Sequence, residues 1–232
     1  SRGKGGSMHL IDLPSGFLAA TPIVGATIPI AVGAAFGSVM LGEKRVVVVF
    51  FGDGATEEGV FHESLNFAAL KKLPVIFVCE NNRYSVYSPL PVRQPQGRRI
   101  IDLANAHGIK TFEGDGNNVI DVYEKAEQAV QNTREGNGPS FLEFYTYRWL
   151  EHCGPFCDDQ LRYRPRGELD EWKTRCPIDR FEKRFVGKED FSNQEAEMIR
   201  EEVIRQVEDA FVFARESAFP RANQLLADVY AP

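Results

Sequence analysis

Hydrophobic and polar positions follow two alternating periods along the first 145 residues of the chain. Six consecutive apolar residues, 46–51, predict a strand buried on both faces, which would place it centrally in a parallel sheet. Apolar positions at helical spacing between residues 60 and 70 predict a helix, and a second apolar run at 75–80 predicts the next strand. Strand, helix and strand in this order indicate an α/β protein.

The same alternation continues beyond the second strand. The pattern predicts a helix at 102–107, a strand at 109–114, a helix capped by Asn118 and a further strand within 139–148. The expected fold class is therefore α/β, with an open parallel sheet. A second GDGNN sequence at 114–118 has a structural explanation, because Gly116 and Asn118 lie between a strand and a capped helix.

Two later segments depart from this alternation. Residues 149–177 lack any period and are rich in Arg, Pro, Asp and Cys, which predicts an irregular loop that is either functional or disordered. Ser192 and Glu195 form a capping-box pattern ahead of a helix of about six turns with one apolar face. We expect an α/β domain at 1–148, an active-site loop region at 149–177, and a C-terminal helical arm of the same domain at 178–232.

Composition narrows the class of protein. The chain of 232 residues carries 33 acidic and 27 basic side chains, which disfavours a nucleic-acid-binding surface, and its 43% hydrophobic content is ordinary for a globular protein. Four cysteines are too few for a secreted disulfide framework, so we expect a reducing compartment, the bacterial cytoplasm or alternatively the mitochondrial matrix. No charged residue occurs within 13–42, but three prolines and many small residues favour a buried helix, closely packed at Gly33 and Gly37, over a membrane span.

The sequence GDGATEEG carries the strongest chemical signal, because it follows the strand at 46–51. Ligands bind beyond the carboxyl ends of strands in open α/β sheets, and the amides of Gly54 and Ala55 precede a helix N-terminus, which favours phosphate. A carboxylate at Asp53 repels phosphate unless a cation intervenes, so the motif indicates a magnesium-bridged diphosphate. The second strand ends near Asn82, whose amide oxygen is a suitable magnesium ligand.

The spacing strengthens this interpretation, because 26 residues containing one helix and one strand separate GDG from NN. The arrangement resembles the thiamine diphosphate motif. The surrounding sequences GKGGSMH, IVGA, NFAALKKLPVIFVCENNRY and YTYRW…EH resemble the alpha subunit of thiamine diphosphate-dependent 2-oxoacid dehydrogenases over nearly the whole chain. The resemblance implies a thiamine diphosphate-binding fold and places the family's N-terminal region outside this sequence.

The resemblance also implies roles for individual residues. Asp53, Asn82 and the carbonyl of Tyr84 would hold Mg²⁺, and the amides of Gly54 and Ala55 would bind the diphosphate. The main chain around Pro22 and Val24 would meet the aminopyrimidine ring, and His152 would reach cofactor and substrate from a mobile loop. The residues expected at the cofactor are Pro22, Val24, Gly25, Gly52, Asp53, Gly54, Ala55, Asn82, Tyr84 and His152.

The implied partners are a beta subunit, in an α2β2 heterotetramer, and a lipoyl acyltransferase. The family's activating glutamate would come from the beta subunit. The expected substrate is a 2-oxoacid, with pyruvate as the first choice. The alternatives are an acetoin-cleaving dehydrogenase, a noncatalytic interaction subunit with a vestigial motif, and the N-terminal half of a split transketolase.

Other polar residues have less specific explanations. His152, Cys153, Cys157 and Asp158 could be taken as zinc ligands, but no second pair completes the spacing of a zinc site. His9 is equally consistent with a structural role and a site role, whereas structural roles are expected for His62 and His107. A solvated or loop-ordering role is expected for Arg148 and Arg164.

Overall fold

A computed structural model describes residues 6, 8–188, 191–224 and 227. The chain divides into two compact units, one comprising Ile23–Arg180 and the other Ser1–Pro22 with Phe181–Pro232. Most of the GKGGSMH sequence lies outside the described residues.

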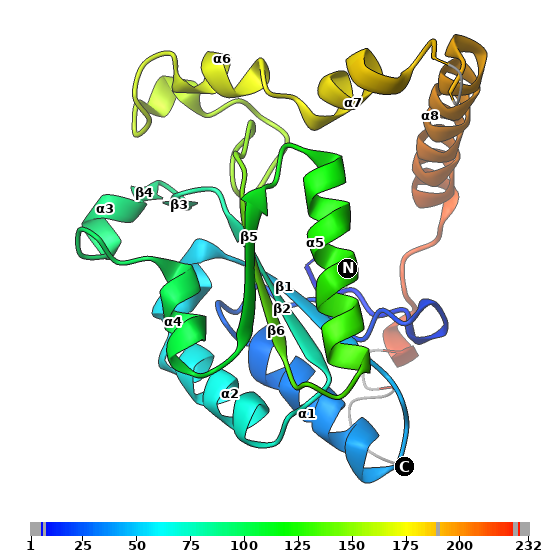
Figure 1. The fold of residues 1–232 in the computed structure, drawn as a ribbon. Helices are drawn as coiled ribbons and strands as arrows, with labels where there is room; N and C mark the ends of the chain where they lie inside the picture. Colours follow the sequence, from blue (N-terminus) through cyan, green and yellow to red (C-terminus); the bar gives the residue numbers. More distant parts are fainter. Residues whose placement is uncertain (1–5, 7, 189–190, 225–226, 228–232) are drawn as a thin grey trace. The chain divides into compact units, whose positions relative to one another are not determined.

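Four parallel strands form the sheet of the Ile23–Arg180 unit (Figure 1), which confirms the predicted α/β class. Their order is β1-β2-β6-β5, and their bounds are Val47–Gly52, Val75–Asn81, Ser140–Tyr145 and Lys110–Asp115. Gly52 of β1 lies opposite Glu80 of β2, and Glu80 lies opposite Phe144 of β6. The carboxyl ends of these three strands therefore meet at one edge of the sheet.

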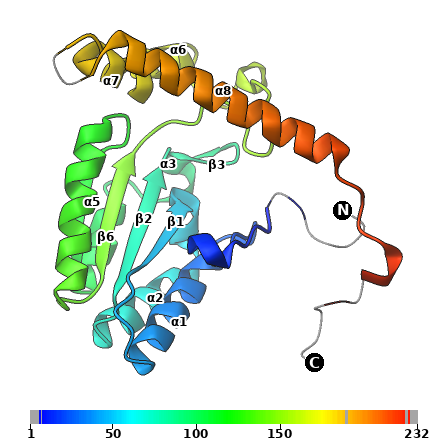
Figure 2. The same ribbon diagram turned by 90° about the vertical axis from the view of Figure 1, so that its right-hand side faces the viewer.

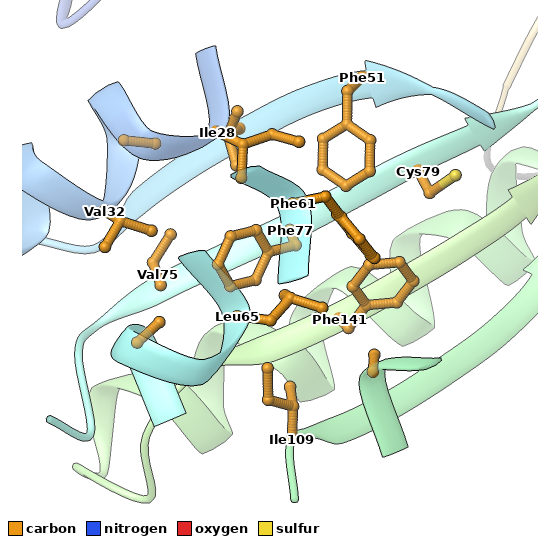
Figure 3. Close-up of a cluster of buried hydrophobic side chains, with 14 of the residues drawn as sticks. Ile28, Val32, Phe51, Phe61, Leu65, Val75, Phe77, Cys79, Ile109 and Phe141 are labelled. Atoms are coloured by element: carbon orange, nitrogen blue, oxygen red, sulfur yellow. The ribbon is translucent and has the colours of Figure 1, made fainter. Parts of the chain in front are cut away.

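Helices cover both faces of this sheet (Figure 2). Helices α1 (Thr27–Met40), α2 (Gly59–Leu70) and α4 (Ile100–Ala106) contribute to a core on one face, and α5 (Val119–Arg134) covers the other. The first core is drawn in Figure 3, where the aromatic rings of Phe51, Phe61 and Phe141 approach one another. Their centroids lie 6.0–6.2 Å apart in tilted or edge-to-face pairs, the geometry that aromatic quadrupoles favour.

The two strands predicted to be buried differ in burial. In β2, alternate residues enter the two cores, with Phe77 on the α1 and α2 side and Val78 on the α5 side. The prediction that β1 is central and buried on both faces is wrong, because β1 forms the edge of the sheet within the described residues. Val48 and Phe50 are 44% and 63% exposed, since α5 packs on β2 and β6 rather than on β1.

The glycines of α1 do not pack as expected. A Cβ atom added at Gly33 or Gly37 would meet nothing within 4 Å, so this side of the helix is open in the described chain. The opposite side carries Ile28, Val32 and Ala35 into the core. None of the described helices combines the length and apolar character that crossing a membrane requires.

The second GDGNN sequence has the structural role that was predicted. The amide of Gly116 donates to the carbonyl of Tyr145 at 2.7 Å, and an added Cβ would lie 2.9 Å from that oxygen. Asn118 is the N-cap residue of α5, as expected, although its side chain makes no cap hydrogen bond.

Two connections contain more structure than the sequence predicted. The loop after β2 forms a hairpin of β3 (Tyr84–Ser85) and β4 (Ser88–Pro89), followed by the short helix α3 (Leu90–Arg93). The segment predicted to be irregular, 149–177, contains η3 (Asp159–Leu161) and α6 (Glu168–Lys173), and α7 (Pro177–Phe185) follows. The short helices escaped prediction because none is long enough to show a hydrophobic period.

The other unit contains the long helix α8 (Asn193–Glu216) and two short 3-10 helices, η1 (Leu13–Ser15) and η4 (Ala222–Gln224). The predicted capping box is confirmed, because Ser192 and Glu195 each accept a hydrogen bond from the other's main-chain amide. The predicted apolar face is present but exposed, with Val203 and Phe211 both more than half accessible.

Candidate cofactor site at the strand ends

Asp53 directly follows β1, at the edge of the sheet where the strand ends. The strand ends at Gly52, and Asp53 begins the 3-10 helix η2 (Asp53–Glu57). The Thr56 hydroxyl donates to the Asp53 carbonyl at 2.7 Å, and this bond fixes the turn. Helix α2 starts only at Gly59, so Gly54 and Ala55 lie within η2 and are separated from the start of α2. The sequence did not predict this separation.

The two carboxylate oxygens of Asp53 have different surroundings. Oδ2 forms an ion pair with Arg93, whose guanidinium also pairs with Glu57. Oδ1 is buried and has no hydrogen-bond partner within the part of the chain that is described. Because a buried acceptor without a partner is costly and rare, this oxygen suits a ligand supplied from outside the chain.

Asn81 and Asn82 at the end of β2 have separate roles. Asn81 is buried, and its amide nitrogen donates to Glu143 Oε1 at 2.7 Å. Asn82 is half-buried, and its Oδ1 accepts the main-chain N–H of Tyr84 at 2.9 Å across a tight turn. Arg83 in that turn has a left-handed φ of 67°. An amide oxygen has two lone pairs, so Asn82 Oδ1 retains the capacity to bind a cation.

The loops that follow β1 and β2 are in close contact. A Cβ added at Gly54 would lie 2.7 Å from Ser85 Oγ and 3.0 Å from Ser85 Cβ, so only glycine fits here without rearrangement. Gly25 has a positive φ of 75°, and its added Cβ would lie 3.2 Å from the side chain of Glu58, directly after η2. The structure therefore brings together the segments that contain Gly25, Asp53 and Tyr84.

Other residues expected at the cofactor are not joined to this group. His152 is exposed on the loop after β6, and within the described chain no hydrogen bond or ion pair links it to Asp53 or Asn82. Val24 is exposed at the start of the Ile23–Arg180 unit. Pro22 and His9 belong to the other unit, and both are exposed there.

A buried ion pair orders the loop after β6. Asp158 lies 3.4 Å from Arg164 and 3.3 Å from Arg148, which confirms the loop-ordering role of both arginines. The Arg164 guanidinium also lies over the rings of Tyr84, Tyr147 and Tyr163, at 4.9–5.7 Å from their centroids. Although burial alone raises the pKa of Asp158, the Tyr163 hydroxyl and the two guanidiniums outweigh it and lower this pKa.

An aromatic cluster connects this loop to the candidate site. It consists of Tyr84, Tyr147, Leu169 and Trp172, with Trp149 and Tyr163 packed against them. The hydroxyls of Tyr84 and Tyr147 donate to Glu168 Oε2 at 2.7 and 3.0 Å. Burial, followed by the hydrogen bond to Glu168, raises the pKa of Tyr84, so its hydroxyl stays protonated as a donor. The side chain of Tyr84 is thus fixed to the segment after β6.

Sequence reasoning missed Arg93 and Glu168. The GDG motif predicted a cation near Asp53, but no pattern around residue 93 identifies the arginine that contacts Asp53. The described residues contain no group of three or more His, Cys, Asp and Glu side chains that could hold a metal ion. The predicted magnesium ligands are of another kind, one carboxylate with an amide oxygen and a main-chain carbonyl, which are oxygen donors that Mg²⁺ accepts.

Comparison with known proteins gives matches over almost the whole chain. The model of the family described as "Dehydrogenase E1 component" matches residues 1–223. The alpha subunit of acetoin:2,6-dichlorophenolindophenol oxidoreductase from Bacillus subtilis is 38% identical over 230 residues, which cover 99% of this chain and 67% of that protein. The pyruvate dehydrogenase E1 component subunit alpha of Porphyra purpurea is 37% identical over 238 residues, which cover 100% and 68% of the two chains.

Two further similarities extend this set. The pyruvate dehydrogenase E1 component subunit alpha of Rickettsia felis is 35% identical over 230 residues, covering 99% of this chain and 69% of that protein. A solved structure from Mycobacterium smegmatis, described as a thiamin diphosphate-dependent enzyme, has a TM-score of 0.44 and 27% sequence identity, and the match covers 57% of this chain and 24% of that chain.

Proposed function

The chain belongs to the dehydrogenase E1 component family, as an alpha subunit of the thiamine diphosphate-dependent 2-oxoacid dehydrogenase type, and from this premise we propose that it acts on pyruvate with Mg²⁺ as a second cofactor. The carboxylate of the 2-oxoacid would leave as carbon dioxide, and the acyl group would pass to a lipoyl acyltransferase. The second candidate is acetoin cleavage, which the similarity to the Bacillus subtilis acetoin oxidoreductase subunit favours.

The buried, unpartnered Oδ1 of Asp53 is the observation that carries the proposal of a cofactor site with Mg²⁺. It lies in the loop after β1, and the turn carrying Asn82 and Tyr84 follows the neighbouring strand β2. In our proposal Asp53 Oδ1, Asn82 Oδ1 and the Tyr84 carbonyl hold Mg²⁺. These three oxygens fit the preference of Mg²⁺ for hard ligands and leave positions for diphosphate oxygens and water.

The remaining residues of the site would bind and orient the cofactor. The glycine at position 54 lets the main chain run close to Ser85, and the amides of Gly54 and Ala55 would face the diphosphate. The main chain of Pro22 and Val24 would orient the aminopyrimidine. Thiamine diphosphate, when bound, supplies the nucleophilic carbon that attacks the 2-oxo group. His152, exposed on its loop, would contact the substrate from the solvent side.

The proposal includes partners. A beta subunit would supply the glutamate that activates the cofactor, in an α2β2 assembly, as membership of the family implies. The open glycine side of α1 is consistent with close approach of another chain at Gly33 and Gly37. All four cysteines are free, in agreement with a reducing compartment, for which we propose the cytoplasm.

Reconstitution tests the proposal. The full-length alpha chain is combined with its beta subunit, thiamine diphosphate and Mg²⁺, and turnover of pyruvate, a branched-chain 2-oxoacid and acetoin is measured with an artificial electron acceptor. We expect pyruvate to be turned over fastest, and only when both subunits are present. Preferential turnover of acetoin would establish the second candidate. Decarboxylation by the alpha chain alone would contradict a shared site, and failure to bind thiamine diphosphate would indicate a noncatalytic subunit.

A further inference from the structure

The guanidinium of Arg93 is fixed by contacts at all three of its nitrogens. Nη2 pairs with Asp53 Oδ2, Nη1 pairs with Glu57 Oε1, and Nε donates to the carbonyl of Ser88 at 3.1 Å. The side chain is only 10% exposed, although it is a long charged chain at the end of the short helix α3. A planar guanidinium with its nitrogens fixed in this way has little freedom to rotate.

Arg93 joins the two segments that would supply the metal ligands. Its guanidinium contacts Asp53 and Glu57, the first and last residues of η2. Its own main chain belongs to α3, which is tied to the β2 turn because the amide of Leu90 donates to the carbonyl of Arg83 at 2.8 Å. Gln94, the next residue, donates to Glu57 at 3.1 Å and strengthens the same connection. Arg93 and Gln94 thus connect the two ligand segments.

The contacts of Arg93 also determine which oxygen of Asp53 stays free. A carboxylate rotates readily about its last bond, because the two-fold torsion of an aspartate side chain is broad. The ion pair at Oδ2 removes this freedom and leaves Oδ1 buried without a partner. The guanidinium pairs with Oδ2 and makes no hydrogen bond to Oδ1, so the lone pairs of Oδ1 are not used by Arg93.

We propose that Arg93 is a positioning residue that orients Asp53 so that Oδ1 receives the divalent cation of the cofactor. This inference rests on the proposed function, since it assigns Asp53 to the metal site. Partners that hold a metal ligand in place commonly contribute 10- to 100-fold to metal affinity. We therefore expect Arg93→Gln to weaken the binding of a divalent cation by roughly this factor.

The experiment measures Mn²⁺ binding to the reconstituted alpha and beta complex with thiamine diphosphate, by electron paramagnetic resonance, so that it does not depend on turnover. Arg93→Gln should weaken Mn²⁺ binding about 10- to 100-fold, and Arg93→Lys should recover only part of the loss, because an ammonium cannot reach all three partners. Arg99→Gln is the matched control, because Arg99 pairs with Glu113 at 2.6 Å and makes no contact with Asp53. The complex with Arg99→Gln should bind Mn²⁺ as tightly as the wild type does.

Glu57→Gln provides a second test in case Arg93→Gln does not fold. The Glu57 side chain is 27% exposed, so we expect the protein to tolerate a glutamine at this position. The variant loses the ion pair between Glu57 and Arg93, and it should therefore weaken Mn²⁺ binding, but less than Arg93→Gln does. Unchanged affinity in Glu57→Gln and in any folded Arg93 variant would overturn the proposal. Tighter binding would also overturn it, because Arg93 would then be a competing cation.

Asp53→Asn separates failure of this inference from failure of the proposed function. If Asp53→Asn weakens Mn²⁺ binding and Arg93→Gln does not, Asp53 is a ligand that needs no positioning, and only the inference on Arg93 fails. If Asp53→Asn leaves Mn²⁺ affinity unchanged, the proposed metal site itself is wrong, and the role of Arg93 is wrong with it.

Discussion

The end of β1 and the middle of β6 each bury a carboxylate, Asp53 and Glu143, and each residue is 1% exposed. Glu143 is completely satisfied, because Oε1 accepts from the Asn81 amide at 2.7 Å and Oε2 accepts from the Ile101 main-chain N–H at 2.9 Å. Asp53 has a partner at one oxygen only. Equally buried carboxylates can therefore have different roles, since Glu143 uses both oxygens within the fold and Asp53 leaves one oxygen that can bind a ligand.

The environment of Glu143 supports this distinction. Burial raises its pKa, and the hydrogen bonds from Asn81 and Ile101 only partly offset that effect. Both donors come from elements at the same edge of the sheet, the end of β2 and the start of α4. Glu143 thus holds the strand ends in place, next to the turn that carries Asn82.

The largest difference between the two carboxylates is expected in catalysis. Asp53→Asn should lower kcat/KM of the reconstituted complex on the order of 100-fold or more, because a charged magnesium ligand is lost. Glu143→Gln should retain most of the activity at a temperature where it is folded. Steady-state kinetics on the two variants, across a range of Mg²⁺ concentrations, compare them directly. Equal losses in both variants would remove the distinction between the two roles.

The free energy of unfolding should fall in Glu143→Gln, the variant that is expected to keep most of its activity. Glu143→Gln turns one acceptor into a donor that faces Asn81 or Ile101, and leaving a buried polar group unpaired costs about 2–3 kcal/mol. Urea unfolding of the variant should show this loss. Glu80→Gln is the control, since Glu80 is an exposed residue on the neighbouring strand, and it should change the free energy of unfolding by less than about 0.5 kcal/mol. A stable Glu143→Gln protein would mean that its hydrogen bonds contribute little.

Gly54 tests how closely the loop at Asp53 must approach its neighbour. Gly54→Ala should destabilise the protein by about 1–2 kcal/mol, because the new methyl group would lie 3.0 Å from Ser85 Cβ. Ser85→Gly removes that contact, so the double variant should recover most of the loss. Thermal unfolding of the two single variants and the double variant completes the cycle. Additive losses would show that Ser85 is not the obstacle.

The pH dependence of stability gives the smallest effect. Because the pKa of Glu143 is raised in the folded state, the folded protein binds more protons than the unfolded chain above the ordinary value of 4.5. The contribution of this group to the free energy of unfolding is therefore greatest at or below that pH and is lost as pH rises through the raised pKa. Urea unfolding at a series of pH values should show this decline in the wild type and a shallower slope in Glu143→Gln. Identical slopes would contradict the assignment.

The sequence predicted the parts of the fold that depend on local pattern. Apolar runs located the strands, and GDG and NN placed Asp53 and Asn82 after neighbouring strands, as found. The sequence could not show that β1 lies at an edge, because an edge strand and a central strand can have the same apolar run. The contacts of Arg93 with Asp53 and of Asn81 with Glu143 join residues 40 and 62 positions apart, so no local period reveals them.

The aromatic cluster beside the site has a consequence for spectroscopy. The chain has two tryptophans, Trp149 and Trp172, and both lie in the segment after β6. Trp172 is 8% exposed, stacks on Tyr147 with ring centroids 5.3 Å apart, and lies under the Arg175 guanidinium at 4.4 Å. Exposure of these rings to water shifts their emission to longer wavelengths. Intrinsic fluorescence excited at the tryptophan band therefore reports on this one segment, so its ordering can be followed in the alpha chain without attaching a dye.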